Sequence, residues 1–244
     1  MRAMILAAGR GERMRPLTDR TPKPLLTVGG VPLIGHSIRR LREAGYRDLV
    51  INTAHLGEQI EARLGDGGAL GVRIRYSREP PGALETAGGI REALDLLGSD
   101  PFLVINADIW CDHPLRPPTL AAEALAHLVL VANPEHHPQG DFTLRDGLVG
   151  LAGGPRHTFA GIGWYRPDLF AGLPRGRRAL GPLLREAVTS GRVTGELHRG
   201  HWIDVGTPER LRLLDQKETR QGRVNAQQST LAKRVGGETD QGLM

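Results

Sequence analysis

The sequence predicts an α/β fold with three layers (α/β/α), in which a mixed, mostly parallel sheet is flanked by helices. Over the first 110 residues, short apolar runs that fit strands alternate with segments whose apolar residues recur at helical spacing. This alternation is typical of parallel strands joined by crossover helices. The length of 244 residues and the hydrophobic content of 39% suit one large domain.

Each element of the first half follows from its own pattern. Residues 3–8 form an apolar run that predicts a strand. The helix expected at 31–44 carries apolar residues at positions 33, 34, 38 and 41 and ends at Gly45, a suitable C-terminal stop. The segment LVIN predicts a second strand, and FLVIN predicts the most apolar one. We expect strands at 3–8, 49–52, 72–76 and 102–106, and helices at 31–44, 56–64 and 86–97.

The second half changes in character after a strand at 128–132. Residues 133–140 are rich in turn-forming residues, and Asp146-Gly147 predicts a two-residue hairpin between strands at 142–144 and 148–151. A strand at 158–165 and a helix at 179–189 follow. Thr207 and Pro208 fit the cap and first position of a helix over 207–217. We expect one domain over 1–221, and a polar, disordered tail over 222–244.

Composition limits the possible partners. The formal net charge is +5, so nucleic acid must be considered, but acidic residues are interspersed and no stretch combines clustered basic residues with aromatics. The single cysteine, Cys111, allows no disulfide within the chain and predicts no cysteine-based zinc site. Neither an apolar span of membrane length nor a signal-peptide pattern is present. We therefore expect a cytoplasmic protein without a membrane partner.

The most informative stretch is residues 6–25, LAAGRGERMRPLTDRTPKPL. Glycine allows close approach of the backbone to an anion, so the amides of 9–11 can form a phosphate nest. Arg13 and Lys23 add full positive charges. Three of the 32 basic residues are lysines, and one of them, Lys23, lies between two prolines that stiffen its loop. A solvated surface loop is the alternative interpretation.

Two aspartates are candidates for a metal site. Asp108 directly follows the most apolar strand, and a carboxylate there can hold Mg²⁺ together with phosphate oxygens. An aspartate alone at this position is more typical of a turn or a helix cap. A second carboxylate, Asp204, lies in the run HWIDVGTPERL just before a predicted helix. If its strand packs beside the first, both aspartates can bind one metal ion, although spacing in sequence cannot show that they meet.

Other residues leave alternatives open. The start of the helix at 85–89 can accept a base edge or an anion, or can serve capping and close packing alone. Asp141 can bind a sugar hydroxyl or stabilise a turn. The histidines at 136, 137, 198 and 201 raise the possibility of a zinc site, but no HExxH or repeated metal spacing occurs. Cys111 is more typical of a small buried residue than of a nucleophile.

Four separated motifs resemble, in type and order, those of the sugar-1-phosphate nucleotidylyltransferases: LAAGRGERMRPLT, TPKPL, NADIW and WIDVGTPERL. The resemblance covers about residues 1–220. It implies a Rossmann-like nucleotidyltransferase fold of the GT-A kind, with a nucleotide-binding part (1–109) and a sugar-binding part (110–205). Within the family, Glu12 and the stretches LETAGGI and AHLVLVANPEHHPQGDF look most like the uridylyltransferases that act on N-acetylmuramate α-1-phosphate in cell-wall recycling.

The resemblance implies Mg²⁺-dependent transfer of UMP from UTP to this sugar phosphate, which gives UDP-N-acetylmuramic acid and pyrophosphate. Mannose 1-phosphate with GTP, glucose 1-phosphate with dTTP or UTP, and a non-catalytic nucleotide- or nucleic-acid-binding module are the alternatives. The implied residues are Arg13, Lys23 and Asp108 for catalysis; Ala8, Gly9, Gly11, Glu12, Arg13, Lys23, Glu79, Thr86 and Gly88 for the nucleotide; Asn106, Asp141, Gly161 and Asp204 for the sugar; and Asp108 and Asp204 for the metal.

The resemblance departs from the family pattern at one place. Relatives tend to carry Glu-Lys-Pro before the late strand, and the lysine meets the sugar phosphate. The corresponding residues here are 151–157, LAGGPRH, in which Arg156 is the candidate replacement. Related larger enzymes associate through additional C-terminal segments, so we expect this chain to be a monomer that acts on small molecules, not on nucleic acid.

Overall fold

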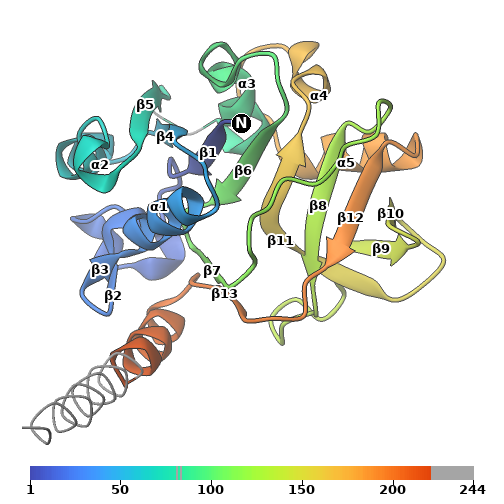
Figure 1. Cartoon of the computed structure of the whole chain (residues 1–244). Helices are drawn as coiled ribbons and strands as arrows, with labels where there is room; N and C mark the ends of the chain where they lie inside the picture. Colours follow the sequence, from blue (N-terminus) through green and yellow to red (C-terminus); the bar gives the residue numbers. More distant parts are fainter. Residues whose placement is uncertain (81, 83, 221–244) are drawn as a thin grey trace, which may run out of the picture.

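The computed structural model describes residues 1–220 apart from 81 and 83, and at its centre is a nine-stranded mixed sheet (Figure 1). The strand order is β5-β4-β1-β6-β11-β8-β12-β10-β9. The strands of the first half are β1 (Ala3–Leu6), β4 (Asp48–Thr53), β5 (Arg73–Arg78) and β6 (Phe102–Asn106). Those of the second half are β8 (Ala126–Val131), β9 (Phe142–Arg145), β10 (Leu148–Gly150), β11 (Arg156–Tyr165) and β12 (Val193–Leu197).

The first four strands are parallel, as the alternating pattern predicted. β1 pairs with β4 on one side and with β6 on the other, and β4 pairs with β5. The chain therefore moves outward from β1 through β4 and β5 and returns to the opposite side of β1 at β6. In parallel sheets of this kind, ligands bind at the carboxyl ends of the strands beside such a reversal. The β1–β6 pair marks that position here.

Antiparallel pairing dominates the second half. β11 is antiparallel to both β6 and β8, whereas β12 returns parallel to β8. β9 and β10 form the predicted hairpin, with Asp146 at φ 51° and Gly147 at φ 78°, as a two-residue turn requires. β12 was not predicted, because its sequence VTGEL lacks a continuous apolar run.

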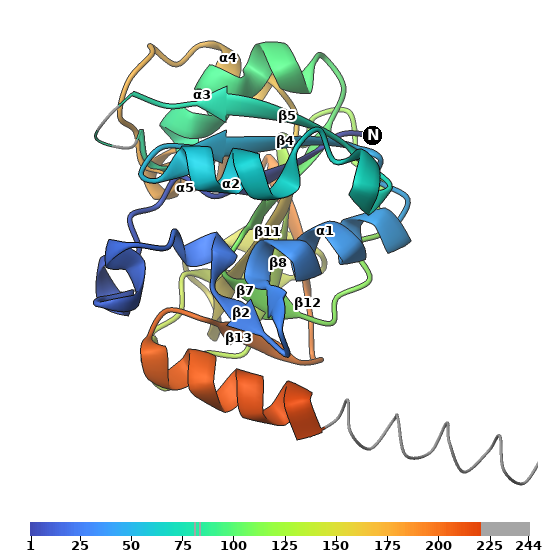
Figure 2. The same ribbon diagram turned by 90° about the vertical axis from the view of Figure 1, so that its left-hand side faces the viewer.

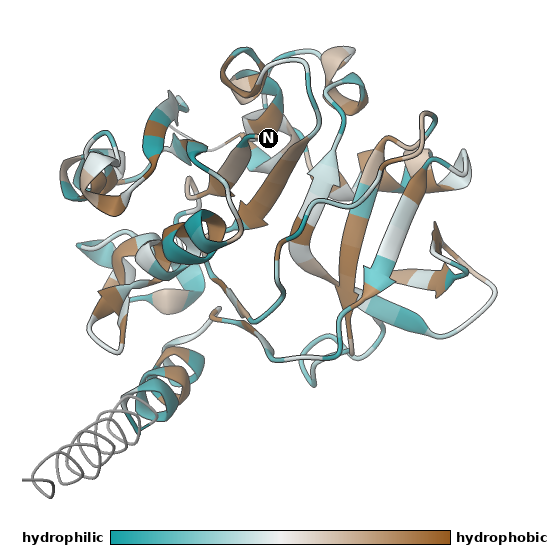
Figure 3. Ribbon diagram, viewed as in Figure 1, coloured by the Kyte–Doolittle hydropathy of each residue, from teal (hydrophilic) through white to brown (hydrophobic). Residues whose placement is uncertain are grey.

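Helices cover both faces of the sheet (Figure 2). α1 (Leu33–Glu43) and α2 (Gly57–Leu64) lie on one face, and α3 (Glu85–Leu97), α4 (Asp168–Ala171) and α5 (Leu180–Thr189) lie on the other. Successive side chains of β1 point to opposite faces of the sheet. Ile5 therefore packs in the core formed with α1 and α2, and Met4 packs in the core formed with α3. The central strands are accordingly apolar, whereas the outer helix faces are polar (Figure 3).

Two short ribbons lie outside the main sheet. One is the β2 (Thr27–Val28) and β3 (Val31–Pro32) hairpin, and the other pairs β7 (Ile109–Cys111) with β13 (Trp202–Asp204). Neither β7 nor the first hairpin was predicted. A final helix covers residues 208–220 of the described chain, and the Thr207 hydroxyl accepts a hydrogen bond from the Arg210 amide at 3.4 Å.

The expected tail over 222–244 lies outside the described residues. Among the helices that the structure describes, none combines the length and the apolar character needed to cross a bilayer.

Candidate functional site

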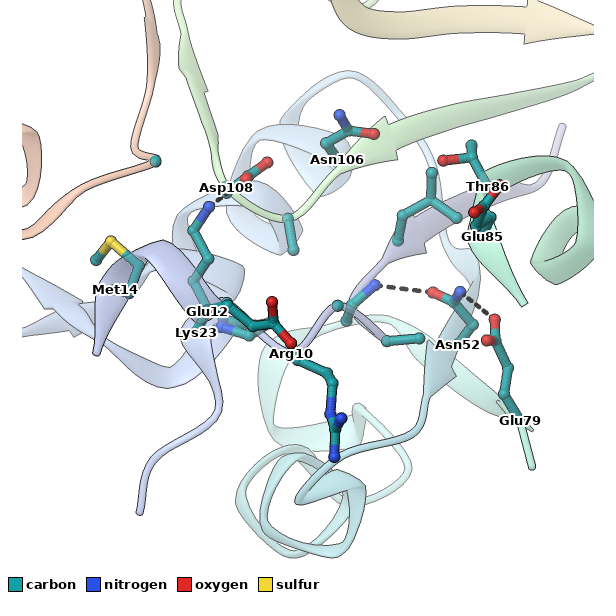
Figure 4. A pocket seen from close by; sticks show the side chains of 18 of the residues that line it. Arg10, Glu12, Met14, Lys23, Asn52, Glu79, Glu85, Thr86, Asn106 and Asp108 are labelled. Carbon is teal, nitrogen blue, oxygen red and sulfur yellow. Dashed lines mark hydrogen bonds and ion pairs between the residues drawn. The ribbon is translucent and has the colours of Figure 1, made fainter. Parts of the chain in front are cut away.

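A cavity of about 540 Å³ lies at the carboxyl ends of β1, β4 and β6, where the strand order reverses. Figure 4 shows the side chains that converge on it from the β1 loop, the Lys23 turn, α3 and the end of β6. Ten of the fourteen predicted site residues line it: Ala8, Gly9, Gly11, Glu12, Arg13, Lys23, Glu79, Thr86, Asn106 and Asp108. The other four, Gly88, Asp141, Gly161 and Asp204, do not.

The conformation of the β1 loop depends on Gly11. Its φ is +63°, and a Cβ there would lie 2.9 Å from the Thr18 side chain and 3.1 Å from Lys23 Cβ. The Gly11 carbonyl accepts hydrogen bonds from the Thr18 hydroxyl and the Met14 amide, both at 2.8 Å. Glycine is therefore needed for both the backbone angle and the space, and it packs the loop directly against the lysine turn.

Lys23 and Asp108 form an ion pair on the wall of the cavity (Figure 4). The side chain of Lys23 is 12% exposed and that of Asp108 is 27% exposed. Lys23 begins a short helical turn (Lys23–Leu25) after Pro22, and Asp108 follows β6. The Ala107 amide donates to the Leu6 carbonyl at 3.1 Å, which holds the end of β6 beside the β1 loop. The β1 loop and the predicted metal ligand Asp108 therefore lie together, as expected.

Asp204 reaches the same region through the β7–β13 ribbon. It lies opposite Ile109 in the register, and the Val205 amide donates to the Asp108 carbonyl at 3.0 Å. Its carboxylate accepts a hydrogen bond from Arg210 at 3.1 Å, and His136 Nε2 lies 3.6 Å away. The strand of Asp204 thus packs beside β7, the continuation of β6, although its side chain does not line the cavity.

The Arg13 side chain lies near Asp204, beside Gly206. A Cβ on Gly206 would lie 2.9 Å from Asp204 Oδ1 and 3.1 Å from an Arg13 guanidinium nitrogen. Asp204 and Arg13 therefore approach the same glycine from different elements. Asp108 and Asp204 offer the hard oxygen donors that suit Mg²⁺. The negative charge of Asp108 is paired with Lys23, and that of Asp204 is paired with Arg210. The donor chemistry of the two residues fits the expected metal.

A second group of possible metal ligands lies elsewhere. One ligand atom from each of Cys111, Asp112 and His198 lies within 4.8 Å of the other two. Burial raises the pKa of the Cys111 thiol, which is unfavourable for a nucleophile. This group is distinct from the predicted pair of aspartates.

Asn52 and Glu79 join three elements beneath the cavity (Figure 4). Asn52 accepts a hydrogen bond from the Ala7 amide at 2.8 Å and donates one to Glu79 at 2.7 Å. The second oxygen of Glu79 accepts from the Leu84 amide at 2.7 Å. Both residues are buried, so this network fixes the β1 loop relative to the start of α3.

We expect Asn52→Ala to lower the free energy of unfolding by about 2–4 kcal/mol, because the Ala7 amide and the Glu79 carboxylate each lose a buried partner. Urea unfolding followed by circular dichroism measures this change. In a double-mutant cycle, Asn52→Ala combined with Glu79→Ala is expected to cost less than the sum of the single losses. An unchanged midpoint for Asn52→Ala contradicts the role of the network.

The α3 side of the cavity carries Glu85 and Thr86, and Arg177 pairs with Glu85 at 2.8 Å. Gly88 was predicted to bind the nucleotide, but it does not line the cavity. Its amide donates to the Arg178 carbonyl, and a Cβ there would lie 2.3 Å from the Gly176 carbonyl. The close-packing alternative therefore describes Gly88 better than a nucleotide contact.

The residues predicted for the sugar are spread outward from the cavity. Gly161, at φ +72°, leaves room for Asn106, whose side-chain nitrogen would lie 2.7 Å from a Cβ at that glycine. Asp141 is engaged by His137 of its own loop at 3.1 Å and by the Phe159 amide of β11 at 2.8 Å. Arg156 donates to the Leu151 carbonyl and is exposed.

Eleven lining residues were missing from the predicted set, and four of them carry polar or charged side chains: Arg10, Asn52, Glu85 and Arg177. Asn52 could have been predicted, because it lies near the end of a parallel strand and, like Asn106, pairs with Leu6 at the end of β1. Arg10 lies within the glycine loop itself. Arg177 lies in the arginine-rich stretch 175–178 before α5, and no pattern marked it.

Comparisons with known proteins show which proteins this chain is similar to. A sequence model described as nucleotidyl transferase matches residues 2–143. The N-acetylmuramate α-1-phosphate uridylyltransferase of Neisseria meningitidis serogroup B is 55% identical over 221 residues, which cover 87% of this chain and 96% of that protein. The enzyme of the same name from Caulobacter vibrioides is 38% identical over 85% of this chain and 92% of its own. A crystal structure described as a glucose-1-phosphate thymidylyltransferase from Bacillus anthracis superposes with a TM-score of 0.77 at 25% identity, over 90% and 95% of the two chains.

Proposed function

The chain belongs to the nucleotidyl transferase family, and we propose that it transfers UMP from UTP to N-acetylmuramate α-1-phosphate. In this reaction, an oxygen of the sugar phosphate forms a bond to the α-phosphorus of UTP. The bond between that phosphorus and the oxygen bridging to the β-phosphorus breaks, so UDP-N-acetylmuramic acid and pyrophosphate are the products. The reaction would serve cell-wall recycling, as the resemblance of the motifs implies, and the two bacterial relatives are named for the same sugar phosphate.

One observation carries the proposal. The Lys23 ammonium and the Asp108 carboxylate meet on the wall of a cavity that begins at a glycine loop and lies at the strand-order reversal. Phosphoryl and nucleotidyl transfers depend mainly on positioning and on neutralisation of charge, not on covalent catalysis. A cation on a rigid turn, an anion nest and a carboxylate are the groups that this chemistry needs.

The β1 loop would hold the triphosphate. The amides of 9–11 and the Arg13 guanidinium would bind the β- and γ-phosphates, which leave as pyrophosphate. Lys23 would contact the α-phosphate, where negative charge accumulates during in-line attack. The base would lie over Ala8 and Gly9, against the segment between Glu79 and Thr86. The network of Asn52 and Glu79 would keep these two walls at a fixed separation.

Asp108 and Asp204 would hold Mg²⁺, which when bound neutralises phosphate charge and so reduces repulsion between the two anionic reactants. Their separate basic partners suit this role, because Lys23 and Arg210 each offset the charge of one carboxylate in the absence of a cation.

Of the four residues proposed to bind the sugar, Asn106 lines the cavity. Asn106 would contact the sugar from the cavity wall, with Gly161 behind it and Asp141 and Asp204 farther out. This assigns nucleotide binding to residues 1–109 and sugar binding to residues 110–205 within one domain. Arg156 would have to leave the Leu151 carbonyl in order to serve the sugar phosphate.

A panel of nucleoside triphosphates against sugar 1-phosphates tests this function, with pyrophosphate release as the readout. UTP with N-acetylmuramate α-1-phosphate is expected to give the highest kcat/KM. A higher value for GTP with mannose 1-phosphate, or for dTTP or UTP with glucose 1-phosphate, contradicts the choice of substrate. Salt-sensitive binding to DNA or RNA with no pyrophosphate from any pair contradicts the enzyme itself.

The chain would act as a monomer in the cytoplasm, on two small-molecule substrates and without nucleic acid. The charge pattern supports the absence of a nucleic-acid partner, because basic and acidic residues are interspersed and no stretch of the sequence combines clustered basic residues with aromatics.

A further inference from the structure

The group formed by Cys111, Asp112 and His198 lies at the end of the β7–β13 ribbon that is remote from Asp108. Cys111 is the last residue of β7 and pairs with Trp202. Asp112 follows it, and its amide donates to the His201 carbonyl at 3.0 Å. His198 follows β12, and its amide donates to the Leu130 carbonyl at 2.8 Å, so its backbone extends the main sheet. The three side chains therefore connect the ribbon to the main sheet.

The ligand atoms of this group already face one another. His198 Nε2 lies 2.7 Å from Asp112 Oδ1, and the Cys111 sulfur lies within 4.8 Å of both. Cys111 is buried and the His198 side chain is 13% exposed, whereas the Asp112 side chain is 51% exposed. The group thus has two enclosed ligands and one side open to solvent.

Gly200 provides an independent observation. A Cβ at this position would lie 2.3 Å from Asp112 Oδ1 and 2.7 Å from His198 Nε2. The φ of Gly200 does not lie in the left-handed region, so its backbone angle does not require glycine. The aspartate and histidine side chains occupy the space beside this glycine, so the absence of a Cβ lets them meet there.

We propose that Cys111, Asp112 and His198 bind one Zn²⁺ ion, with water from the open side as a fourth ligand. Thiolate, imidazole and carboxylate together suit zinc, whereas Mg²⁺ takes oxygen ligands alone. In a tetrahedral site with bonds of about 2.0–2.1 Å, the nitrogen and oxygen ligands lie about 3.3 Å apart, so Asp112 and His198 need only a small separation. Binding displaces the proton of the Cys111 thiol.

His113 is close to this group but is not one of its ligands. Its Nδ1 accepts a hydrogen bond from the Leu115 amide at 3.1 Å, which leaves the proton on Nε2, 3.1 Å from Glu196. Its ring packs edge-on against His198, with the ring centroids 5.2 Å apart. This contact limits rotation of the His198 ring and so helps to keep Nε2 directed at Asp112.

The site lies where two parts of the fold meet. The ion would join the loop between β12 and β13 to the end of β7, and so would fix the ribbon whose other end carries Asp108 and Asp204. The three ligands come from segments 86 residues apart, which is why no zinc spacing is visible in the sequence. The proposal is independent of the transferase activity.

Cobalt binding tests the site directly. The full chain is freed of metals with a chelator, and Co²⁺ is then added. Because Cys111 is the single cysteine of the sequence, a thiolate-to-cobalt charge-transfer band can arise only from this residue. We expect the band to saturate at one equivalent of Co²⁺ and to disappear when Zn²⁺ is added. Absence of the band overturns the proposal.

Variants separate the site from other metal binding. Cys111→Ser is expected to abolish the band, and Asp112→Asn or His198→Ala to weaken Zn²⁺ binding at least about tenfold. His201→Ala is the matched control, because this exposed histidine shares the loop and contributes only its carbonyl to the hydrogen bond with Asp112. Zn²⁺ is expected to raise the Tm of the wild-type chain and of His201→Ala, but not of Cys111→Ser. An equal rise in all three overturns the assignment.

Discussion

Replacing Lys23 by alanine is expected to lower kcat by about 10²–10³-fold, or about 2.7–4 kcal/mol, as for loss of one donor to a transition state. The ammonium is 12% exposed and lies on the cavity wall, so its charge is weakly screened. Its turn follows Pro22 and packs against Gly11, which leaves little freedom to lose on binding. Initial rates of pyrophosphate release at saturating substrates measure the effect.

Lys217→Ala is the matched control for Lys23→Ala. It removes the same charge from an exposed position on the helix over 208–220 and is expected to leave kcat unchanged. Lys23→Arg keeps the charge but replaces a compact ammonium by a planar group, so it is expected to recover only part of the rate. Thermal unfolding of each variant shows whether the loss of the Asp108 partner reduces stability. If Lys23→Ala turns over at the wild-type rate, Lys23 takes no part in the reaction.

The parallel half of the fold was predictable because each of its elements carries its own periodic signal. The apolar residues of α1 and of β6 repeat in ways that fit one type of element each, and a parallel pair requires a helix between its strands. The ribbons carry no such signal. β7 has three residues and derives its stability from Trp202 and its neighbours, 91 residues later, so only the tertiary pairing makes it a strand.

In the candidate site, too, some residues could be placed from local sequence and others could not. The β1 loop, Lys23 and Asp108 could be predicted, because glycines, prolines and the end of an apolar strand restrict where those side chains can point. Gly88 and Arg177 could not be placed, because both depend on how the loop before α5 packs against α3. A helix-start glycine has the same sequence signature whether it meets a ligand or a carbonyl.

The position of Asp204 beside Asp108 depends on the topology of the fold. A carboxylate 96 residues after Asp108 has no local reason to be near it, yet the Val205 amide bonds to the Asp108 carbonyl. What the sequence could not predict is the local partner: Arg210, one turn into the following helix, holds the Asp204 carboxylate at 3.1 Å. A cation held by Asp204 would share this carboxylate with Arg210, so we expect the affinity for the metal to depend on Arg210 as well as on the two aspartates.

Asp108→Asn and Asp204→Asn are each expected to abolish Mg²⁺-dependent turnover, because asparagine keeps the shape of the side chain but loses the charge that attracts a divalent cation. Rates of pyrophosphate release across a Mg²⁺ titration measure this loss. Calorimetric titration of Mg²⁺ into the chain with UTP present shows whether the variants fail to bind the metal or fail at a later step.

Asp95→Asn, on the exposed face of α3, is the control for these two variants and is expected to behave as the wild type. The two aspartates also make separable predictions. Loss of the Asp108 charge leaves Lys23 without its anionic partner, whereas loss of the Asp204 charge leaves Arg210 bonded to the backbone carbonyl of residue 204, with His136 3.4 Å away. Arg210→Ala should therefore strengthen Mg²⁺ binding if Asp204 is a ligand, because the competing guanidinium is gone. Full activity of the wild-type chain in excess EDTA, or weaker Mg²⁺ binding by Arg210→Ala, contradicts the assignment of these aspartates to a shared metal ion.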